Sequence, residues 1–64
     1  MDMDKKKLVN IMADKGLTQA ELAEKAGVSR TAIYGAMKGR TPRLNTLGKI
    51  AKVLGVKPSE LLDM

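Results

Sequence analysis

The sequence predicts an all-α fold, a compact single domain of five short helices over residues 1–64. Ala, Leu, Lys, Glu and Met dominate the composition, and all five favour helix. Apolar residues recur at helical spacing, and the runs are bounded by residues that start or end helices. Because the loops between the runs are only a few residues long, the helices should pack as one domain without strands. We expect the ends, about residues 1–3 and 63–64, to fray.

The first helix is expected over residues 5–15. Asp4 can cap its start, and Gly16 can end it in the left-handed conformation. Its inward face carries Leu8, Ile11 and Met12. The second helix starts at Thr18, because Thr18 and Glu21 have the spacing of a capping box. Its inner stripe consists of Leu22, Ala23 and Ala26.

The third helix is expected over residues 29–38, after a corner at Gly27 that requires a positive φ. Ser29 can cap its start, and Gly39 stops it. Its inward side carries Ile33, Ala36 and Met37. Its outward side carries Arg30, Thr31, Tyr34 and Lys38. Gly35 costs about 1 kcal/mol relative to Ala inside this helix, so either something approaches the backbone closely there or the site is simply exposed.

A loop with two arginines, Arg40 and Arg43, leads to a fourth helix that runs from Leu44 or Asn45 to Leu54 and ends at Gly55. Its inward residues are Leu47, Ile50, Ala51 and Leu54. A last single-turn helix is expected over about residues 59–63, with Pro58 and Glu60 at its start and with Leu61 and Leu62 buried.

The composition excludes several classes of protein. With no Cys and no His, disulfides, zinc fingers and imidazole catalysis are ruled out. No apolar run approaches the ~18 residues of a membrane span, and residues 1–7 lack the apolar stretch of a signal peptide. The carboxylates of Glu21 and Glu24 fit a solvated pair on a helix face. We therefore expect a cytoplasmic protein without membrane contact, and no enzyme, metal or cofactor.

Charge is distributed unevenly along the chain. The net charge is +5, and residues 25–57 contain eight Lys or Arg and no Asp or Glu. An unbroken basic segment of this kind is typical of a protein that binds a polyanion. A solvated basic surface without a partner is the alternative that charge alone leaves open.

The stretch LTQAELAEKAGVSRTAIYGAMKG resembles the helix-turn-helix of phage repressor and Cro-type regulators, also called the XRE or lambda-repressor-like family. The similarity continues through TPRLNTLGKIAKVLGVKPSELL and covers about residues 8–62. The resemblance implies that the second and third helices form the helix-turn-helix. It also implies that the third enters the major groove of double-stranded DNA with its N-terminal residues at the bases.

The resemblance implies a role for particular residues. Base readers would be Arg30, Thr31 and Tyr34, although the Tyr34 ring can instead pack on the second helix. Gly35 stands where family members often have another reader, so the readout would be poorer than usual. Phosphate contacts would come from Gln19, Ser29, Lys38, Arg40, Arg43, Asn45 and Thr46. A dimer surface is implied at Val56, Lys57, Pro58 and Leu61, with the chain end to Met64 as a further candidate.

One pair departs from the family pattern. Many members have Arg at the Met12 position and Glu at the Met37 position, paired inside, and replacing such a pair by apolar residues is often neutral or stabilising. We predict that Met12 and Met37 pack against each other.

The function implied is that of a small repressor of phage or mobile-element type. It would occupy a near-palindromic operator as a homodimer, with recognition helices about 34 Å apart. The alternative is an antitoxin or protein-interaction module of the same fold, which would have a protein partner.

Overall fold

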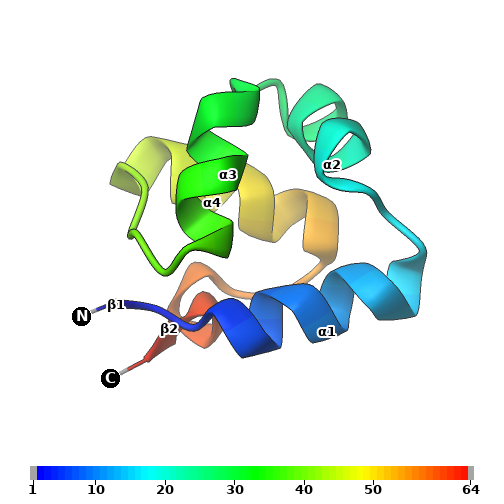
Figure 1. Ribbon diagram of the computed structural model, residues 1–64. Coiled ribbons are helices and arrows are strands. Elements are labelled where there is room, and N and C mark those ends of the chain that lie inside the picture. The colour runs from blue at the N-terminus through cyan, green and yellow to red at the C-terminus, as the bar shows by residue number, and fades with distance from the viewer. Residues whose placement is uncertain (1, 64) are drawn as a thin grey trace.

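The computed structural model describes residues 2–63, which form four α-helices, one 3-10 turn and two very short strands (Figure 1). In chain order the elements are β1 (Asp2–Met3), α1 (Lys5–Lys15), α2 (Gln19–Ala26), α3 (Arg30–Met37), α4 (Leu44–Leu54), η1 (Pro58–Leu61) and β2 (Leu62–Asp63). The four α-helices lie where the sequence predicts them. Within residues 2–63 no helix has both the length and the apolar character needed to cross a bilayer.

The expected fifth helix is wrong in type and extent. The chain makes a single 3-10 turn at Pro58–Leu61, in which the Lys57 N–H donates to the Glu60 carboxylate over 2.9 Å. Leu62 then leaves the turn in an extended conformation, at φ −106° and ψ 139°. The helix cannot continue to residue 63 because Leu62 and Asp63 pair with the start of the chain.

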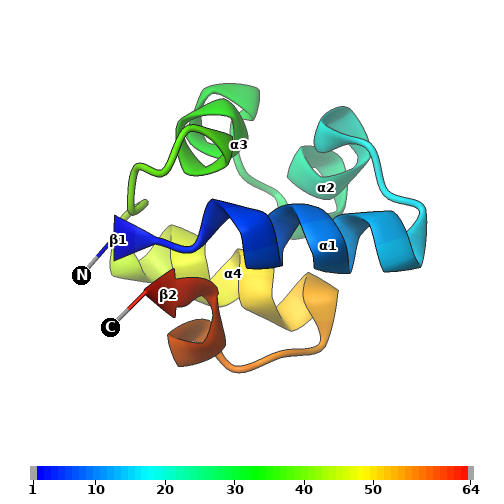
Figure 2. The same ribbon diagram turned by 60° about the horizontal axis from the view of Figure 1, so that its bottom comes forward.

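The two chain ends pair with each other, whereas the sequence predicts frayed ends and no strands. Asp2 lies opposite Asp63 and Met3 opposite Leu62 in an antiparallel register, and the Asp4 N–H donates to the Leu61 carbonyl over 2.8 Å. Figures 1 and 2 show the two strands side by side. Met3 is only 4% exposed, so its burial fixes the pairing. Met1 and Met64, also expected to fray, lie outside the described residues.

The helix starts form as the sequence predicts. The Asp4 carboxylate accepts from the Lys7 N–H over 3.1 Å. Thr18 and Glu21 form a reciprocal capping box, with bonds of 3.1 and 3.0 Å. At the corner after α2, Gly27 adopts φ 68° and ψ 35°, which brings the Val28 N–H back to the Ala23 carbonyl over 3.0 Å. This tight return sets α3 across α2.

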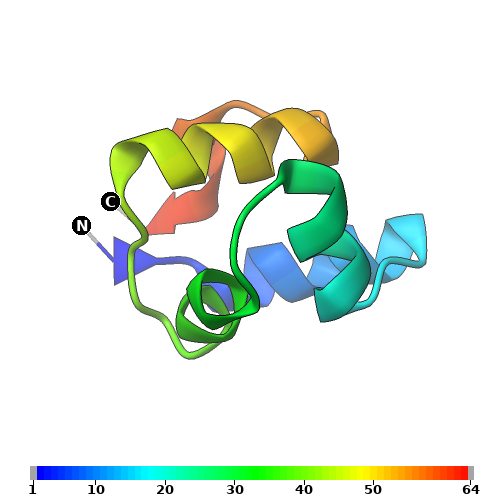
Figure 3. The same ribbon diagram turned by 90° about the horizontal axis from the view of Figure 1, so that it is seen from above.

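The core lies between the helices, and the predicted inward faces supply most of it. Figures 2 and 3 show α1 and α4 running in much the same direction, with α2 and α3 on one side of them. The largest fully buried side chains are Leu8, Leu22, Ile33, Leu47, Ile50, Leu54 and Leu61. Because α2 packs against both α3 and α4, the angle of the helix-turn-helix is fixed by apolar contacts rather than by the corner alone.

Met12 in α1 and Met37 in α3 lie at the same hollow on the surface. Met12 is 5% exposed and belongs to the core, and Met37 is half-buried against that core. Both side chains line one surface hollow, together with Val9 and Leu17. This placement is what the predicted Met–Met packing between α1 and α3 requires.

Candidate nucleic-acid interface

The two faces of α3 differ sharply in burial. Its inner face buries Ile33 and Ala36, at 0% and 1% exposure. Its start is fixed by Ser29, whose hydroxyl accepts from the Ala32 N–H over 3.2 Å. The predicted base readers Arg30, Thr31 and Tyr34 are all exposed, so α3 offers a polar outer face held in place by an apolar inner one.

Tyr34 lies on the outer face of α3. Its side chain is 46% exposed and is not among those packed against the core. This exposure leaves part of the ring available to a ligand and is also compatible with the alternative in which the ring packs on α2. A half-exposed phenol has an apolar ring and a hydroxyl to offer at the same site.

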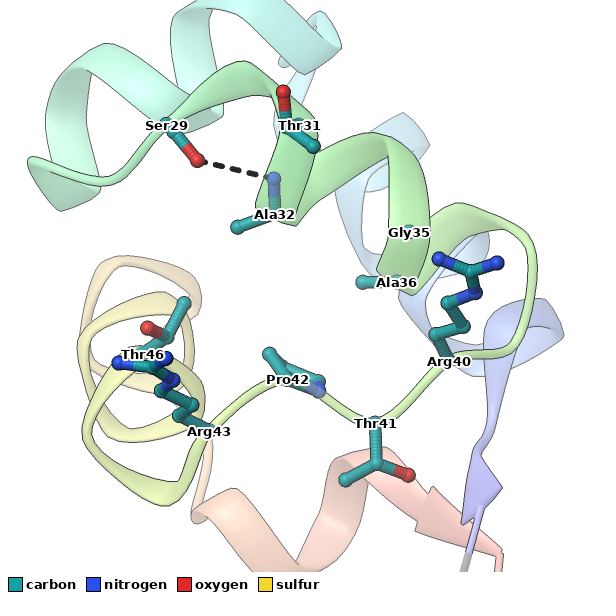
Figure 4. A pocket seen from close by; sticks show the side chains of 10 residues that line it. All are labelled: Ser29, Thr31, Ala32, Gly35, Ala36, Arg40, Thr41, Pro42, Arg43 and Thr46. Atoms are coloured by element: carbon teal, nitrogen blue, oxygen red, sulfur yellow. Dashed lines mark hydrogen bonds between the residues drawn. The ribbon is translucent and has the colours of Figure 1, made fainter.

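A hollow of about 460 Å³ separates α3 from the start of α4 (Figure 4). Its lining combines one side of α3, the loop after it and the first turn of α4. The residues that line it are Ser29, Thr31, Ala32, Gly35, Ala36, Arg40, Thr41, Pro42, Arg43 and Thr46. Five of the predicted site residues meet here, namely Ser29, Thr31, Arg40, Arg43 and Thr46.

The other predicted contacts lie elsewhere on the surface. Gln19, at the first position of α2, is half-buried beside α1 and lines the hollow that Met12 and Met37 share. Lys38 and Asn45 are exposed at the end of α3 and in the first turn of α4. None of these three residues lines the hollow between α3 and α4.

The start of α4 is unlike the starts of the other three α-helices. Asp4, Thr18 and Ser29 cap α1, α2 and α3 through their side chains, whereas Arg43 stands at the N-cap of α4 without a side-chain hydrogen bond. The first turn of α4 carries no acidic residue. Its N–H groups and the positive end of the helix dipole therefore face outward beside an arginine, which is a favourable place for an anion.

The basic side chains around the hollow are available to an external partner. Arg30, Lys38, Arg40 and Arg43 are exposed, and their head groups form no ion pair within residues 2–63. All four belong to the segment without carboxylates, so the field at this face is positive.

Sequence reasoning missed two features of this face. The first is Leu44, which is 80% exposed at the first position of α4, next to Arg43. Its place outside the stripe of Leu47, Ile50, Ala51 and Leu54 is the signal that marks it as outward-facing. The second is the identity of the group that approaches Gly35: it is the Arg40 side chain, whose Cβ and Cδ lie 3.8 Å from where a Cβ at position 35 would be. That approach depends on how the chain turns after α3, and no pattern of apolar residues encodes it.

The residues implied as a dimer surface divide into two kinds. Lys57 and Pro58 are exposed, and Val56 is half-buried against the core. Leu61 is 0% exposed inside its own chain. Its side chain is therefore committed to the core that closes the domain, and we leave it out of the surface offered to a second subunit.

Comparisons with known proteins agree with this geometry. A family model described as helix-turn-helix matches residues 8–61. An uncharacterized HTH-type transcriptional regulator of Methanocaldococcus jannaschii is 45% identical over 58 residues, which are 89% of this chain and 88% of that protein.

Two solved structures are similar in fold and in sequence. SinR of Bacillus subtilis, described as the master regulator for biofilm formation and solved in complex with DNA, has a TM-score of 0.80 and 31% identity over 92% of this chain and 97% of that chain. The restriction-modification controller protein C.AhdI of Aeromonas hydrophila has a TM-score of 0.79 and 32% identity over 91% of this chain and 89% of that chain. The chain therefore belongs to the helix-turn-helix family of the XRE or phage repressor/Cro type, a family of DNA-binding transcriptional regulators that are not enzymes.

Proposed function

We propose that this chain binds double-stranded DNA in a sequence-selective way and regulates transcription by occupying an operator. The observation that carries the proposal is the pairing of two features across one hollow. On one side is the exposed polar face of α3, and on the other is the uncapped start of α4 with Arg43 beside it. A recognition helix and a phosphate site on opposite sides of one hollow allow the same surface both to read bases and to bind the DNA backbone.

Base reading is assigned to the outer face of α3. The Arg30 guanidinium can donate two hydrogen bonds to O6 and N7 of a guanine, and the Thr31 hydroxyl or methyl can contact a base or a thymine methyl. Tyr34 can contact a thymine methyl or a phosphate. All three side chains are exposed, so none must leave a packed position to bind.

Phosphate binding is assigned to residues around this face. The open first turn of α4, with Asn45 and Thr46, can receive one phosphate beside Arg43. Lys38 and Arg40 lie at the end of α3, and Gln19 starts α2. The Ser29 hydroxyl, which caps α3, can also receive a hydrogen bond from water or donate one to a phosphate. The DNA complex of SinR supports this use of the fold.

A homodimer is the form of the protein that suits an operator with two half-sites. Two recognition helices about 34 Å apart would then read adjacent major grooves on one side of the duplex. Lys57 and Pro58 are the exposed residues we assign to the subunit contact, with Val56 behind them. Resemblance to phage repressors favours a small repressor of phage or mobile-element type, acting in the cytoplasm.

A protein partner, as in an antitoxin, is the second candidate. The observation that favours it is apolar surface away from α3's polar face. Val9 is 43% exposed and lines, with Met37, a hollow beside α1. Such a patch can take part in protein contact without blocking the DNA face.

Binding-site selection from random duplexes, followed by a salt titration, tests the proposed function. We expect enrichment of one near-palindromic sequence and a steep fall of log K with log[salt], at roughly −0.9 per phosphate contact. Weak binding to every duplex, insensitive to salt, would refute the DNA function and leave the protein-interaction module as the better explanation.

A further inference from the structure

The chain folds back onto α3 immediately after that helix ends. Gly39 adopts φ 93°, its N–H donates to the Ala36 carbonyl over 3.0 Å, and the Arg40 N–H donates to the Gly35 carbonyl over 2.9 Å. This pair of bonds is the Schellman arrangement of a helix end. It ties the backbone of Arg40 to the residue five positions earlier, on the outer side of α3.

The other three α-helices end in the same way but with a different residue. Leu17, Val28 and Val56 donate to the carbonyls of Met12, Ala23 and Ala51 over 2.9, 3.0 and 3.1 Å. Each of these three side chains is apolar and packs against the core, a contact that often accompanies this motif. After α3 the same place holds Arg40, which is exposed. The arginine therefore lacks the apolar contact of the other three helix ends; its charge suits the negative end of the α3 dipole, and its exposed guanidinium remains available to an outside partner.

The side chain of Arg40 runs along the surface where a side chain at position 35 would begin. A Cβ added to Gly35 would lie 3.8 Å from both Cβ and Cδ of Arg40. Figure 4 shows the Arg40 guanidinium beside Gly35, and both residues belong to the lining of the hollow. Because Gly35 has no side chain, the backbone of α3 is open at this point, and the aliphatic part of the Arg40 side chain covers it.

We propose that Arg40, held across Gly35, reads a guanine in the major groove and so replaces the base-reading side chain that α3 lacks at position 35. A guanidinium has the planar pair of donors that O6 and N7 of guanine accept, and its stem is positioned before DNA arrives. The inference deepens the proposed function and rests on it, because it assigns to Arg40 a specificity that a phosphate contact alone would not give.

Binding-site selection with wild-type protein, Arg40→Lys and Arg40→Ala tests the assignment. Lysine keeps the charge but loses the two-donor fork, so Arg40→Lys should relax one guanine position by roughly 5- to 100-fold while other positions keep their preference. Lys38→Ala, which removes a neighbouring exposed cation, is the control and should weaken all sequences alike. If Arg40→Lys preserves every preference and Arg40→Ala weakens all duplexes equally, Arg40 is a phosphate contact only and the inference fails.

Substitution of Gly35 provides an independent arm. Gly35→Ala adds a methyl at ordinary contact distance from Arg40, so folding and the guanine preference should both remain. Gly35→Gln adds a longer side chain that competes with the arginine stem for the same strip of surface, so the same guanine preference should relax while the melting temperature is maintained. Retention of that preference in Gly35→Gln contradicts the inference. Failure of the wild-type protein to select any sequence refutes the proposed function instead, so the two failures are distinguishable.

Discussion

The starts of α3 and α4 face each other across the same hollow, yet they are built in opposite ways. At α3, the Ser29 hydroxyl accepts a hydrogen bond from the Ala32 N–H, and the side chains of Arg30 and Thr31 are exposed. At α4, Arg43 leaves the first-turn N–H groups without a side-chain cap. A helix start closed by the chain's own oxygen stabilises the fold, whereas an open start beside a cation holds an external anion. Under the proposed function, this difference assigns base reading to α3 and binding of the DNA backbone to α4.

The largest expected effect comes from closing the start of α4. In Arg43→Asp, the carboxylate would cap the first turn and repel a phosphate. Affinity for any duplex should fall by about 3 kcal/mol, roughly a hundredfold, while the free energy of unfolding rises by up to ~1 kcal/mol. Binding isotherms and urea unfolding measure the two changes. Lys49→Asp alters net charge equally in the middle of α4 and should weaken binding less. An equal loss in both variants would mean that the start of α4 is no special site.

At α3 the matching experiment is Arg30→Ala. Because Arg30 is exposed and buries no core surface, unfolding should change by less than ~0.5 kcal/mol. Binding should weaken by about 1–3 kcal/mol for the preferred duplex and lose preference at one position. Competition binding against single-base variants of the selected site measures this loss. Uniform weakening across all duplexes would assign Arg30 to the phosphates and remove the contrast between the two helices.

The same contrast predicts opposite stability changes when caps are exchanged. Ser29→Ala should lower the free energy of unfolding by about 1 kcal/mol, because the Ala32 N–H loses its acceptor. Arg43→Ser should raise it by roughly 0.5–1 kcal/mol, because the first turn of α4 gains an acceptor. Urea unfolding of both variants checks the signs. If neither Arg43→Ser nor Arg43→Asp raises the free energy of unfolding, solvent already satisfies the N–H groups in the first turn of α4.

Sequence patterns predicted the parts of the molecule that obey a local rule. The capping box at Thr18, the corner at Gly27 and the buried stripe of α4 each follow from short spacings, and the structure confirms them. The pairing of residues 2–3 with 62–63 escaped prediction because two-residue strands carry no alternation to detect. The prediction of a fifth helix was wrong for the same reason, because Leu62 pairs with Met3 and does not continue the turn before it.

The residues of the candidate site remain a prediction from the resemblance and the charge pattern, whereas their arrangement in space could not be predicted from the sequence. The resemblance groups Arg40 with Lys38 and Arg43 with the start of the fourth helix, but it does not give the contacts that either residue makes. In the structure Arg40 is bonded back to α3 and Arg43 opens α4, so the two belong to different elements. Leu61 was placed on a surface because its family position is near the dimer contact, whereas its own chain buries it completely.

The smallest expected effect concerns α2, whose start is closed by a titratable group. The hydrogen bond from the Thr18 backbone N–H to Glu21, with a further bond to the Thr18 side chain and the charge of Lys25, lowers the pKa of Glu21 below its ordinary 4.5. A carboxylate whose pKa falls on folding stabilises the native state at pH above its ordinary pKa, and this contribution disappears as the pH falls through the lowered pKa.

Glu21→Gln keeps an oxygen acceptor but no charge. Wild type should therefore melt slightly above Glu21→Gln at pH 7, and the gap should close towards pH 3. Thermal melts across this range measure the gap, and a gap that stays constant with pH would mean that the charge of Glu21 contributes nothing to the cap.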